Sequence, residues 1–173
     1  MTHQELAAKV YEVAHLKGQF LLRSGQTSHQ YFDKYQFEAR PQILKAIAEQ
    51  LQPLLPQGFD LLGAMEMGGI PVATALSMNI NRPMVLLRKE AKKYGTCKFA
   101  EGPDIQGKKI CIVEDVITTG GAVVQSVNML REQGAKVEDV VCVINRSTDG
   151  APRLKALDLK VHSLFTLKDF PES

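Results

Sequence analysis

The residues most able to do chemistry lie in one short stretch, VEDVITTGGA, at residues 113–122. Two adjacent acids, Glu114 and Asp115, follow an apolar run, and two threonines and two glycines come next. Glycines let the backbone come close to a ligand, and the backbone amides at the start of a helix bind phosphate. Carboxylates repel a phosphate, but they bind sugar hydroxyls or a hydrated metal ion. The stretch therefore favours a sugar phosphate as ligand.

The same stretch has a plainer interpretation, in which the acids only end a strand and the glycines only turn the chain. An isolated pair of acids would favour that interpretation. Here acids, threonines and glycines share one strand–loop–helix junction, which favours ligand binding. No lysine follows the glycines and GxGxxG is absent, so the stretch is neither a Walker loop nor a dinucleotide fingerprint.

A second candidate segment is basic. Residues 88–98, RKEAKKYGTCK, contain five lysines or arginines against one acid, Glu90. A charge run is most often a solvated face, but this one lies in a long connection between two predicted strands. Long connections often act as active-site lids. Mobile cations that close over a site stabilise a negatively charged group as it leaves.

Three further features are weaker. The aromatic pair Tyr31–Phe32, in RSGQTSHQYFD, is as consistent with core packing as with the lining of a ligand pocket. The glycine pair of MEMGGIP, at residues 65–71, starts a helix and also allows backbone amides to turn toward an anionic ligand. Arg146 follows the apolar run DVVCVIN, where it either binds an anionic group or forms a surface ion pair with Asp149.

The elements that must position these residues begin with a helix predicted over residues 2–16. Thr2 and Glu5 form a capping box at its start. The aromatic-rich residues 18–39 predict two short strands around a turn. Pro41 starts a second amphipathic helix, which the prolines and glycine of residues 53–58 end.

From Phe59 onward, short apolar runs alternate with helical patterns. The predicted strands are FDLLGA, PMVLL, KICIVE, DVVCVIN and VHSLFTL, and the predicted helices are residues 69–78, 121–133 and 151–157. This alternation predicts an α/β fold with a parallel sheet covered on both faces. Ligands of such sheets bind beyond the carboxyl ends of the strands. We expect a single domain over residues 1–173, with a parallel-sheet core from about residue 59 and a small N-terminal hood over about 1–58.

Composition narrows the function classes. The chain has 173 residues, 45% of them hydrophobic, and its 21 basic and 19 acidic residues leave a net charge of +2. This balance argues against a nucleic-acid partner. No apolar run approaches the roughly 20 residues of a membrane helix, so we expect no membrane partner. Three cysteines without a CxxC pair and four scattered histidines predict no protein-built metal site, reduced thiols and a cytoplasmic location. Cys111 and Cys142 are expected as small core side chains.

The stretch VEDVITTGGA resembles the phosphoribosyl pyrophosphate motif of the type I phosphoribosyltransferases, and most closely that of their orotate phosphoribosyltransferase branch. The segments FLLRSGQTSHQYFD, GGIPVATALS, RKEAKKYGT and the single Arg146 resemble that branch in the same order and cover nearly the whole chain. The resemblance implies the type I phosphoribosyltransferase fold with a small hood. It also implies transfer of the 5-phosphoribosyl group from phosphoribosyl pyrophosphate to orotate, giving orotidine 5′-phosphate and pyrophosphate in pyrimidine biosynthesis.

The resemblance also implies roles for individual residues. Catalytic roles fall to Lys89 and Asp115. The residues expected to bind phosphoribosyl pyrophosphate are Arg23, Arg88, Lys89, Lys92, Glu114, Asp115, Val116, Ile117, Thr118, Thr119, Gly120, Gly121 and Ala122. The residues expected to bind orotate are Thr118, Arg146, Tyr31 and Phe32. Tyr94 stands where many relatives have a histidine, and Gly68 where some have a lysine, so those side-chain roles are not carried over.

Mg²⁺ is implied as a cofactor, bound mainly through the substrate. A homodimer with shared active sites is also implied, because in the family the basic loop reaches into the neighbouring subunit's site. Two alternatives stay open. One is a type I phosphoribosyltransferase for another base, such as a purine, against which Thr118 and Arg146 weigh. The other is a non-catalytic regulator that senses phosphoribosyl pyrophosphate and binds nucleic acid. The residues before Phe59 do not resemble a helix-turn-helix, and the intact basic loop argues for turnover.

Overall fold

A sheet of six strands forms the centre of the computed structural model, which describes residues 1–21, 25–91, 98–147 and 152–171. The described elements, in chain order, are α1 (His3–Ala14), β1 (His15–Leu21), β2 (Thr27–Phe32), α2 (Tyr35–Glu38), α3 (Pro41–Leu51), η1 (Gln52–Leu54), β3 (Leu61–Met65), α4 (Gly69–Ile80), β4 (Met84–Leu87), β5 (Ala100–Glu101), β6 (Lys109–Ile117), α5 (Gly121–Glu132), β7 (Lys136–Asn145), α6 (Pro152–Lys155), β8 (Lys160–Thr166) and η2 (Leu167–Asp169).

The order of strands in this sheet is β5-β4-β3-β6-β7-β8. All neighbours are parallel except β4 and β5. The predicted parallel sheet is therefore confirmed, and each of the five predicted apolar runs forms one of its strands. The antiparallel β5 has only two residues, too few for any periodicity, and the sequence gives no sign of it.

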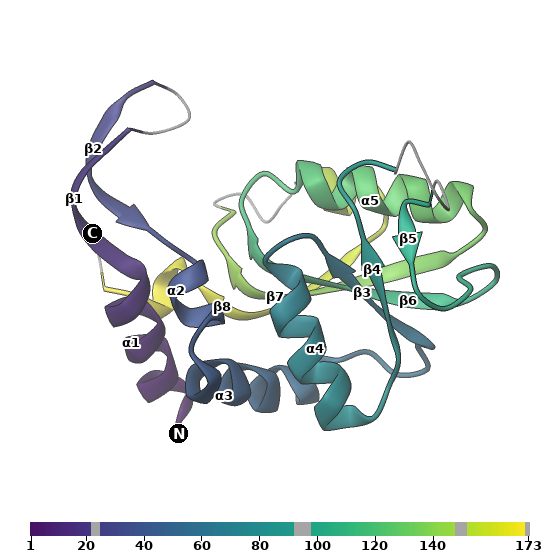
Figure 1. Cartoon of the computed structure of the whole chain (residues 1–173), viewed down its shortest axis with the longest axis horizontal. Helices are drawn as coiled ribbons and strands as arrows, with labels where there is room; N and C mark the ends of the chain where they lie inside the picture. Colours follow the sequence, from purple (N-terminus) through teal and green to yellow (C-terminus); the bar gives the residue numbers. More distant parts are fainter. Residues whose placement is uncertain (22–24, 92–97, 148–151, 172–173) are drawn as a thin grey trace.

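Helices cover both faces of the sheet, as predicted. In Figure 1, α5 lies over one face, and α3 and α4 lie over the other. Each face has its own apolar core, one shared with α3 and α4 and one shared with α5. Cys111 and Cys142 are buried, one in each core, which confirms them as core side chains. None of the helices in the described ranges is long and apolar enough to cross a membrane.

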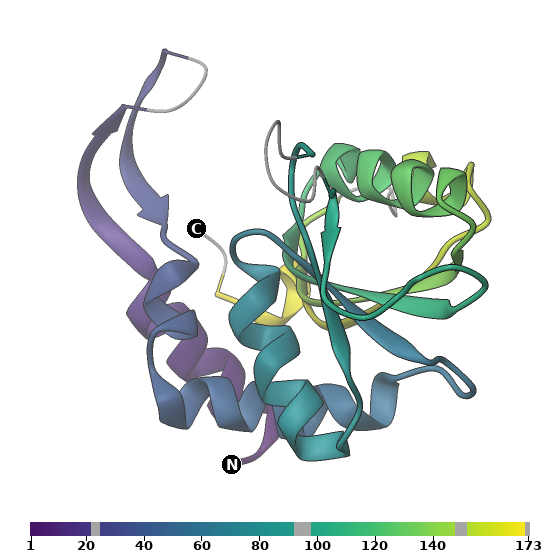
Figure 2. The ribbon, with the colours of Figure 1, turned by 45° about the vertical axis from the view of Figure 1, so that its right-hand side comes forward.

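The N-terminal elements, α1 to η1, form the part of the chain that was predicted as a hood. The capping box of Thr2 and Glu5 is present, although α1 ends at Ala14, two residues earlier than predicted. The strands β1 and β2 pair antiparallel and form a hairpin that projects away from the sheet (Figure 2). Helices α1 and α3 pack into the same core as one face of the sheet. The base of the hairpin is therefore fixed to the sheet while its outer part extends past it.

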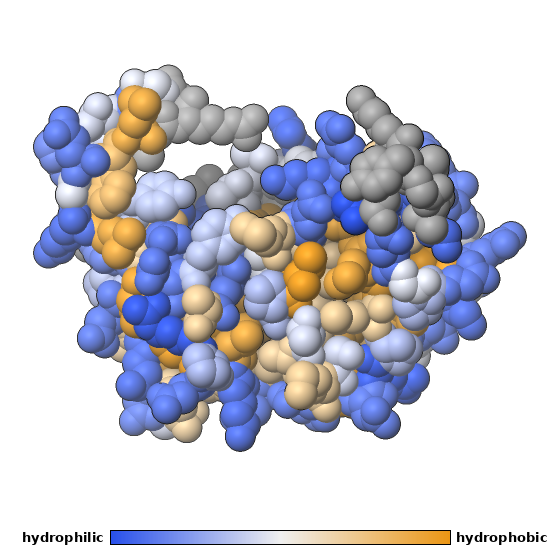
Figure 3. Space-filling model, viewed as in Figure 1, coloured by the Kyte–Doolittle hydropathy of each residue, from blue (hydrophilic) through white to orange (hydrophobic). Residues whose placement is uncertain are grey.

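The outer part of the hairpin exposes apolar surface. Figure 3 shows hydrophobic side chains along it, and Leu21 is 79% exposed. A two-stranded hairpin is only marginally stable in water unless other structure covers it. The hairpin thus offers a surface to a further element or chain.

Two further local features differ from the sequence prediction, and both affect the site. The strand β6 was expected to end at Glu114, but it continues to Ile117, so that both motif acids lie inside a strand. A short helix, α2, follows β2 and was not predicted. It begins beside Asp33, whose carboxylate accepts hydrogen bonds from the Tyr35 backbone N–H and the Gln36 side chain. Four residues are too few to show a helical stripe.

Candidate active site

The junction between β6 and α5 forms the turn expected to bind phosphate. Thr118 and Thr119 are exposed there, and α5 begins at Gly121. Gly120 has a φ of +73°, and a Cβ at this position would lie 3.0 Å from the Leu154 side chain, so the backbone conformation and the packing both favour glycine. No described side chain caps this end of α5. The first amides of α5 are therefore available to an outside anion.

The two acids of the motif are buried within β6. Asp115 is 0% exposed and Glu114 is 9% exposed. The Glu114 carboxylate folds back and accepts a hydrogen bond of 3.0 Å from the Asp115 backbone N–H. The Asp115 carboxylate faces the hood, where its Oδ2 lies 2.6 Å from Nζ of Lys34. Sequence reasoning missed Lys34, because 81 positions separate it from Asp115 and it lies in no recognised motif.

A third acid, Glu38, completes this cluster. It is 6% exposed and projects from α2, four residues after Lys34. Gly68 makes room for the cluster, because a Cβ there would lie 1.6 Å from Oδ2 of Asp115 and 2.9 Å from Oε1 of Glu38. Three segments thus meet at one point: the α2 region, the motif strand β6 and the loop before α4. Glu38 was not predicted either.

The four ionisable groups of the cluster titrate differently. Burial, followed by the neighbouring Asp115 carboxylate, raises the pKa of Glu38 to about 9. Burial also raises the pKa of Glu114 well above its usual value. Burial opposes ionisation of Asp115, but hydrogen bonds with Glu114, Glu38 and Lys34 lower its pKa. Although burial lowers the pKa of Lys34, its contact with Asp115 raises that pKa overall. At neutral pH the cluster therefore holds a charged Lys34–Asp115 pair beside a protonated Glu38.

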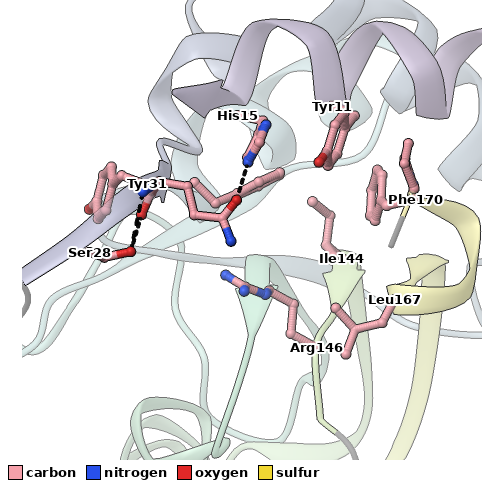
Figure 4. Close-up of a pocket in the computed structure, with 11 residues that line it drawn as sticks. Tyr11, His15, Ser28, Tyr31, Ile144, Arg146, Leu167 and Phe170 are labelled. Atoms are coloured by element: carbon pink, nitrogen blue, oxygen red, sulfur yellow. Dashed lines mark hydrogen bonds between the residues drawn. The ribbon is translucent and has the colours of Figure 1, made fainter. Parts of the chain in front are cut away.

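A cavity of about 710 Å³ lies between the hood hairpin and the carboxyl end of β7 (Figure 4). Its lining residues are Tyr11, His15, Ser28, Gln30, Tyr31, Phe32, Ile144, Arg146, Leu167, Phe170 and Pro171. Three of the four residues predicted to bind orotate, Tyr31, Phe32 and Arg146, are therefore brought together. The cavity volume falls within the range typical of small-molecule sites.

Arg146 is held over the aromatic side of this cavity. Its guanidinium carbon lies 5.5 Å from the centroid of the Phe32 ring, which is cation–π distance. Its backbone N–H donates a 2.8 Å hydrogen bond to the carbonyl of Ile117, the residue before Thr118. Thr118, the fourth predicted residue, does not line the cavity but follows this anchored position directly. The cavity and the turn between β6 and α5, called the motif turn below, are therefore adjacent.

The other walls of the cavity were not predicted. Tyr11 comes from α1 and Phe170 from the C-terminal segment, and their rings stack at 6.0 Å. His15 and Gln30 join across the hairpin through a 2.9 Å side-chain hydrogen bond. These residues belong to opposite ends of the chain, so only the folded topology places them around one cavity.

The described part of the basic segment lies close to α5. Arg88 pairs with Glu101 through Nε and Oε1 at 3.3 Å, so its charge is partly compensated. Lys89 is exposed, and its carbonyl accepts a 3.4 Å hydrogen bond from the Gln125 side chain. Lys92 and Tyr94 lie outside the described residues, as do Arg23 and Asp149.

One more unpredicted cation lies beside the motif turn. The Arg153 guanidinium, on α6, is 3.5 Å from the point where a Cβ of Gly121 would lie. The neighbouring Leu154 is fully buried against Gly120, which fixes α6 to the turn. The sequence showed Arg153 only as part of a predicted helix.

Comparison with known proteins gives a consistent result. The model of the phosphoribosyl transferase domain matches residues 34–167. The chain is 52% identical over 161 residues to the orotate phosphoribosyltransferase of Nocardioides sp., covering 93% of this chain and 90% of that protein. It is 40% identical to the orotate phosphoribosyltransferase of Methanocella arvoryzae, covering 85% and 84% of the two chains.

Solved structures agree with these sequence matches. The orotate phosphoribosyltransferase of Mycobacterium tuberculosis H37Rv, in complex with Fe(III) dicitrate, superimposes with a TM-score of 0.86 at 28% identity, covering 96% of this chain and 97% of that chain. The same enzyme in complex with 5-phospho-α-D-ribosyl 1-diphosphate superimposes with a TM-score of 0.82 at 26% identity and the same coverage. The adenine phosphoribosyl transferase of Trypanosoma brucei is 13% identical with a TM-score of 0.72, which shows a shared fold alone.

Proposed function

The chain belongs to the phosphoribosyltransferase family, and from that premise we propose that it is an orotate phosphoribosyltransferase. It transfers the 5-phosphoribosyl group from phosphoribosyl pyrophosphate to orotate in pyrimidine biosynthesis. The products are orotidine 5′-phosphate and pyrophosphate.

The assignment of orotate as the substrate rests mainly on one observation: Arg146 faces an aromatic pocket next to the motif turn. Orotate is a flat pyrimidine ring with one carboxylate. Phe32 and Tyr31 offer ring faces to the pyrimidine, and Arg146 can grip the carboxylate through two parallel hydrogen bonds. The Thr118 hydroxyl adds a donor at the motif side. A neutral purine gives an arginine in this position no anionic partner.

The donor substrate fits the turn between β6 and α5. Its 5′-phosphate is assigned to the free amides of residues 118–122 and to the hydroxyls of Thr118 and Thr119. The acids Glu114 and Asp115 lie beneath this turn and are assigned to the side of the ribose hydroxyls. A phosphate placed directly against Asp115 would be repelled by its negative charge. The 5′-phosphate of the donor is therefore assigned to the turn, and its ribose hydroxyls are assigned to the acids.

The reaction is a displacement at the anomeric carbon of the ribose. A ring nitrogen of orotate forms a bond to that carbon, the bond from the carbon to the diphosphate oxygen breaks, and the diphosphate leaves with the bonding electrons. The proton on the ring nitrogen passes to solvent. This chemistry requires no nucleophile from the protein. The protein contributes by holding both substrates in contact, excluding water and stabilising the charge that develops on the diphosphate.

We propose that Mg²⁺ enters the site bound to phosphoribosyl pyrophosphate. In the described ranges, no group of three or more histidine, cysteine or acidic side chains could hold a metal ion. Glu114 and Asp115 are buried, and Lys34 already contacts Asp115. These residues fit an ion that keeps most of its ligands as diphosphate oxygens, ribose oxygens and water. When bound, the ion neutralises part of the diphosphate charge.

A homodimer with shared sites is also proposed. Lys89 is exposed at the start of the basic segment and next to α5, where a neighbouring subunit can approach it. The exposed Leu21 on the hairpin fits the same assembly, because a second copy of the chain would cover it. The buried free thiols of Cys111 and Cys142 fit a reducing compartment such as the cytoplasm.

The direct test is a screen of nucleobases with phosphoribosyl pyrophosphate and Mg²⁺, followed by release of pyrophosphate. Orotate should support turnover, whereas uracil, adenine, guanine and hypoxanthine should not. Uracil is the matched control, since it lacks only the carboxylate assigned to Arg146. Turnover with a purine but not with orotate would identify a transferase for another base. Binding of the donor without turnover of any base would favour a regulator.

A further inference from the structure

Lys34 joins two parts of the site that separate elements build. Its Nζ lies 2.6 Å from Oδ2 of Asp115, on the motif strand β6. Two residues before it is Phe32, the last residue of β2, which lines the base pocket and faces Arg146. The path from the donor motif to the base pocket therefore runs through one ion pair and three consecutive residues of the chain.

The connection between Phe32 and Lys34 is rigid. Asp33, between them, donates its backbone N–H to the carbonyl of Ala14 at 2.8 Å, which fixes it to the end of α1. Its carboxylate accepts a 3.2 Å hydrogen bond from the backbone N–H of Tyr35 and so holds the start of α2. Phe37 of α2 is fully buried in the core. A shift of Lys34 would therefore be transmitted to Phe32.

The Lys34–Asp115 ion pair joins a partly exposed lysine to a fully buried carboxylate, so its loss would destabilise the contact between the hood and β6. The side chain of Asp115 is 0% exposed, while that of Lys34 is 33% exposed. Oδ2 of Asp115 and Oε1 of Glu38 are both buried, and Lys34 contacts Oδ2 of Asp115 directly. Lys34 thus supplies the positive charge that faces the Asp115 carboxylate, beside its hydrogen bonds with Glu114 and Glu38. Removing one partner of a buried pair leaves an uncompensated charge, which drives the segments apart.

Gly68 packs directly against Asp115 of β6 and Glu38 of α2. The space that a side chain at this position would occupy is already filled by the carboxyl groups of Asp115 and Glu38. The loop before α4 therefore lies directly against the cluster. The hood, the motif strand and this loop are held at a single contact.

We propose that Lys34 is a positioning residue of the transfer reaction, which fastens the hood to the donor motif through Asp115 and thereby sets Phe32 opposite Arg146. The inference rests on the proposed function, because it concerns the alignment of the orotate pocket with the ribosyl donor. Lys34 itself acts through Asp115 and Phe32.

The test uses Lys34→Met, which keeps most of the side-chain length but removes the charge, and Lys34→Arg, which restores a cation. Lys45→Ala is the matched control, since Lys45 is an exposed lysine of the neighbouring α3 that pairs only loosely with Glu49 at 3.9 Å. We expect Lys34→Met to raise the KM for orotate at least tenfold. The KM for the donor should rise less, because β6 and α5 build the phosphate turn on their own. Lys34→Arg should recover to within about threefold of the unaltered chain.

Hydrogen exchange supplies a readout that does not depend on turnover. Lys34→Met should speed exchange of the amides of residues 27–40, and Lys45→Ala should not. Asp115→Asn should have the same effect, and the double variant should exchange no faster than either single variant, because both remove one contact. The proposal is overturned if Lys34→Met keeps both KM values within twofold, if Lys34→Arg is as impaired as Lys34→Met, or if the two variants act additively. A failure of the unaltered chain to use orotate would instead overturn the proposed function, while the exchange result would still report on the contact.

Discussion

The guanidinium carbon of Arg146 lies 5.5 Å from the centroid of the Phe32 ring, so that the carboxyl end of β7 faces the end of the hood strand β2. This pairing encloses one side of the base pocket with a flat apolar surface and a positive charge. A planar ring that carries a carboxylate matches both features. The backbone N–H of Arg146 donates a hydrogen bond to the Ile117 carbonyl. This hydrogen bond holds Arg146 in place and also connects the pocket to the motif turn.

Arg146→Ala should raise the KM for orotate tenfold or more and leave the KM for phosphoribosyl pyrophosphate nearly unchanged. Losing a charge-assisted contact in a closed site costs about 2–5 kcal/mol, and about 1.4 kcal/mol corresponds to one factor of ten. Steady-state kinetics with each substrate varied in turn gives both values. Arg82→Ala is the control, since Arg82 also lies over an aromatic ring, that of Phe59 at 6.0 Å, but outside the pocket. Equal loss toward both substrates would contradict the carboxylate role.

Glu38→Gln should make the free energy of unfolding less dependent on pH. The folded chain raises the pKa of Glu38 from its ordinary 4.5 to about 9, so between these values the folded state keeps a proton that the unfolded state releases. The contribution of Glu38 to the free energy of unfolding is therefore fully present below pH 4.5. It is lost as the pH rises toward 9, by up to about 1.4 kcal/mol per pH unit. Glutamine mimics the protonated acid at every pH.

Urea unfolding at pH 5 and pH 8 measures this effect. The variant should match the unaltered chain at pH 5 and exceed it at pH 8. Part of the pH dependence of the free energy of unfolding should remain in the variant, because burial raises the pKa of Glu114 as it does that of Glu38. Glu49→Gln, at an exposed acid of α3, should leave the pH dependence unchanged. Equal slopes for Glu38→Gln and the unaltered chain would show that Glu38 is ionised in the folded state.

The parts of the fold that the sequence predicts are those with local signals. Continuous apolar runs mark the strands β3, β4, β6, β7 and β8, and Thr2 with Glu5 marks the start of α1. The motif turn is equally local, because its glycines, threonines and acids are consecutive in the chain. The end of β6 was misplaced for a physical reason: acids are rare in strands, and here Lys34 and a protonated Glu38 allow Asp115 to be buried in one.

The parts that could not be predicted depend on contacts between distant segments. Lys34 meets Asp115, and Tyr11 meets Phe170, only because α1 and the α2 region pack beside the carboxyl end of the sheet. No spacing within a window of sequence encodes either contact. A lysine two residues after an aromatic pair reads as an ordinary surface residue until the fold places a buried carboxylate against it.

Chelation of divalent ions should abolish turnover and leave the melting temperature nearly unchanged. The donor supplies most of the ligands of Mg²⁺ under the proposed function, so the folded chain alone does not depend on the ion. Turnover with and without EDTA, followed by thermal melting of the same samples, separates the two effects. Addition of excess Mg²⁺ should restore turnover. A fall of many degrees in melting temperature would instead indicate a structural metal.

Mixed dimers should test whether two subunits share each site. Lys89→Ala and Asp115→Asn chains should each be almost inactive alone. In a mixed dimer, one of the two sites would combine an intact Asp115 with the intact Lys89 of the other subunit. Random exchange makes about half of the dimers mixed, so activity should recover to roughly a quarter of that of the unaltered protein. An absence of recovery, with exchange confirmed by native mass spectrometry, would place Lys89 and Asp115 of one chain in the same site.

Arg153→Ala should weaken the hold on the 5′-phosphate of the donor. Leu154 is fully buried against Gly120, and this contact keeps Arg153 beside the first residue of α5, with Nη1 3.5 Å from the Cβ point of Gly121. A phosphate on the amides of that turn would lie within reach of the guanidinium. A hydrogen bond to a charged group contributes about 1.5–3 kcal/mol, which corresponds to a tenfold or greater loss of ribose 5-phosphate affinity by calorimetry. Binding of pyrophosphate should be unchanged, because it lacks the 5′-phosphate. Lys155→Ala, two residues along the same short helix, is the matched control and should bind both ligands normally. If Arg153→Ala weakens both ligands equally, or neither, Arg153 has no specific role at the 5′-phosphate.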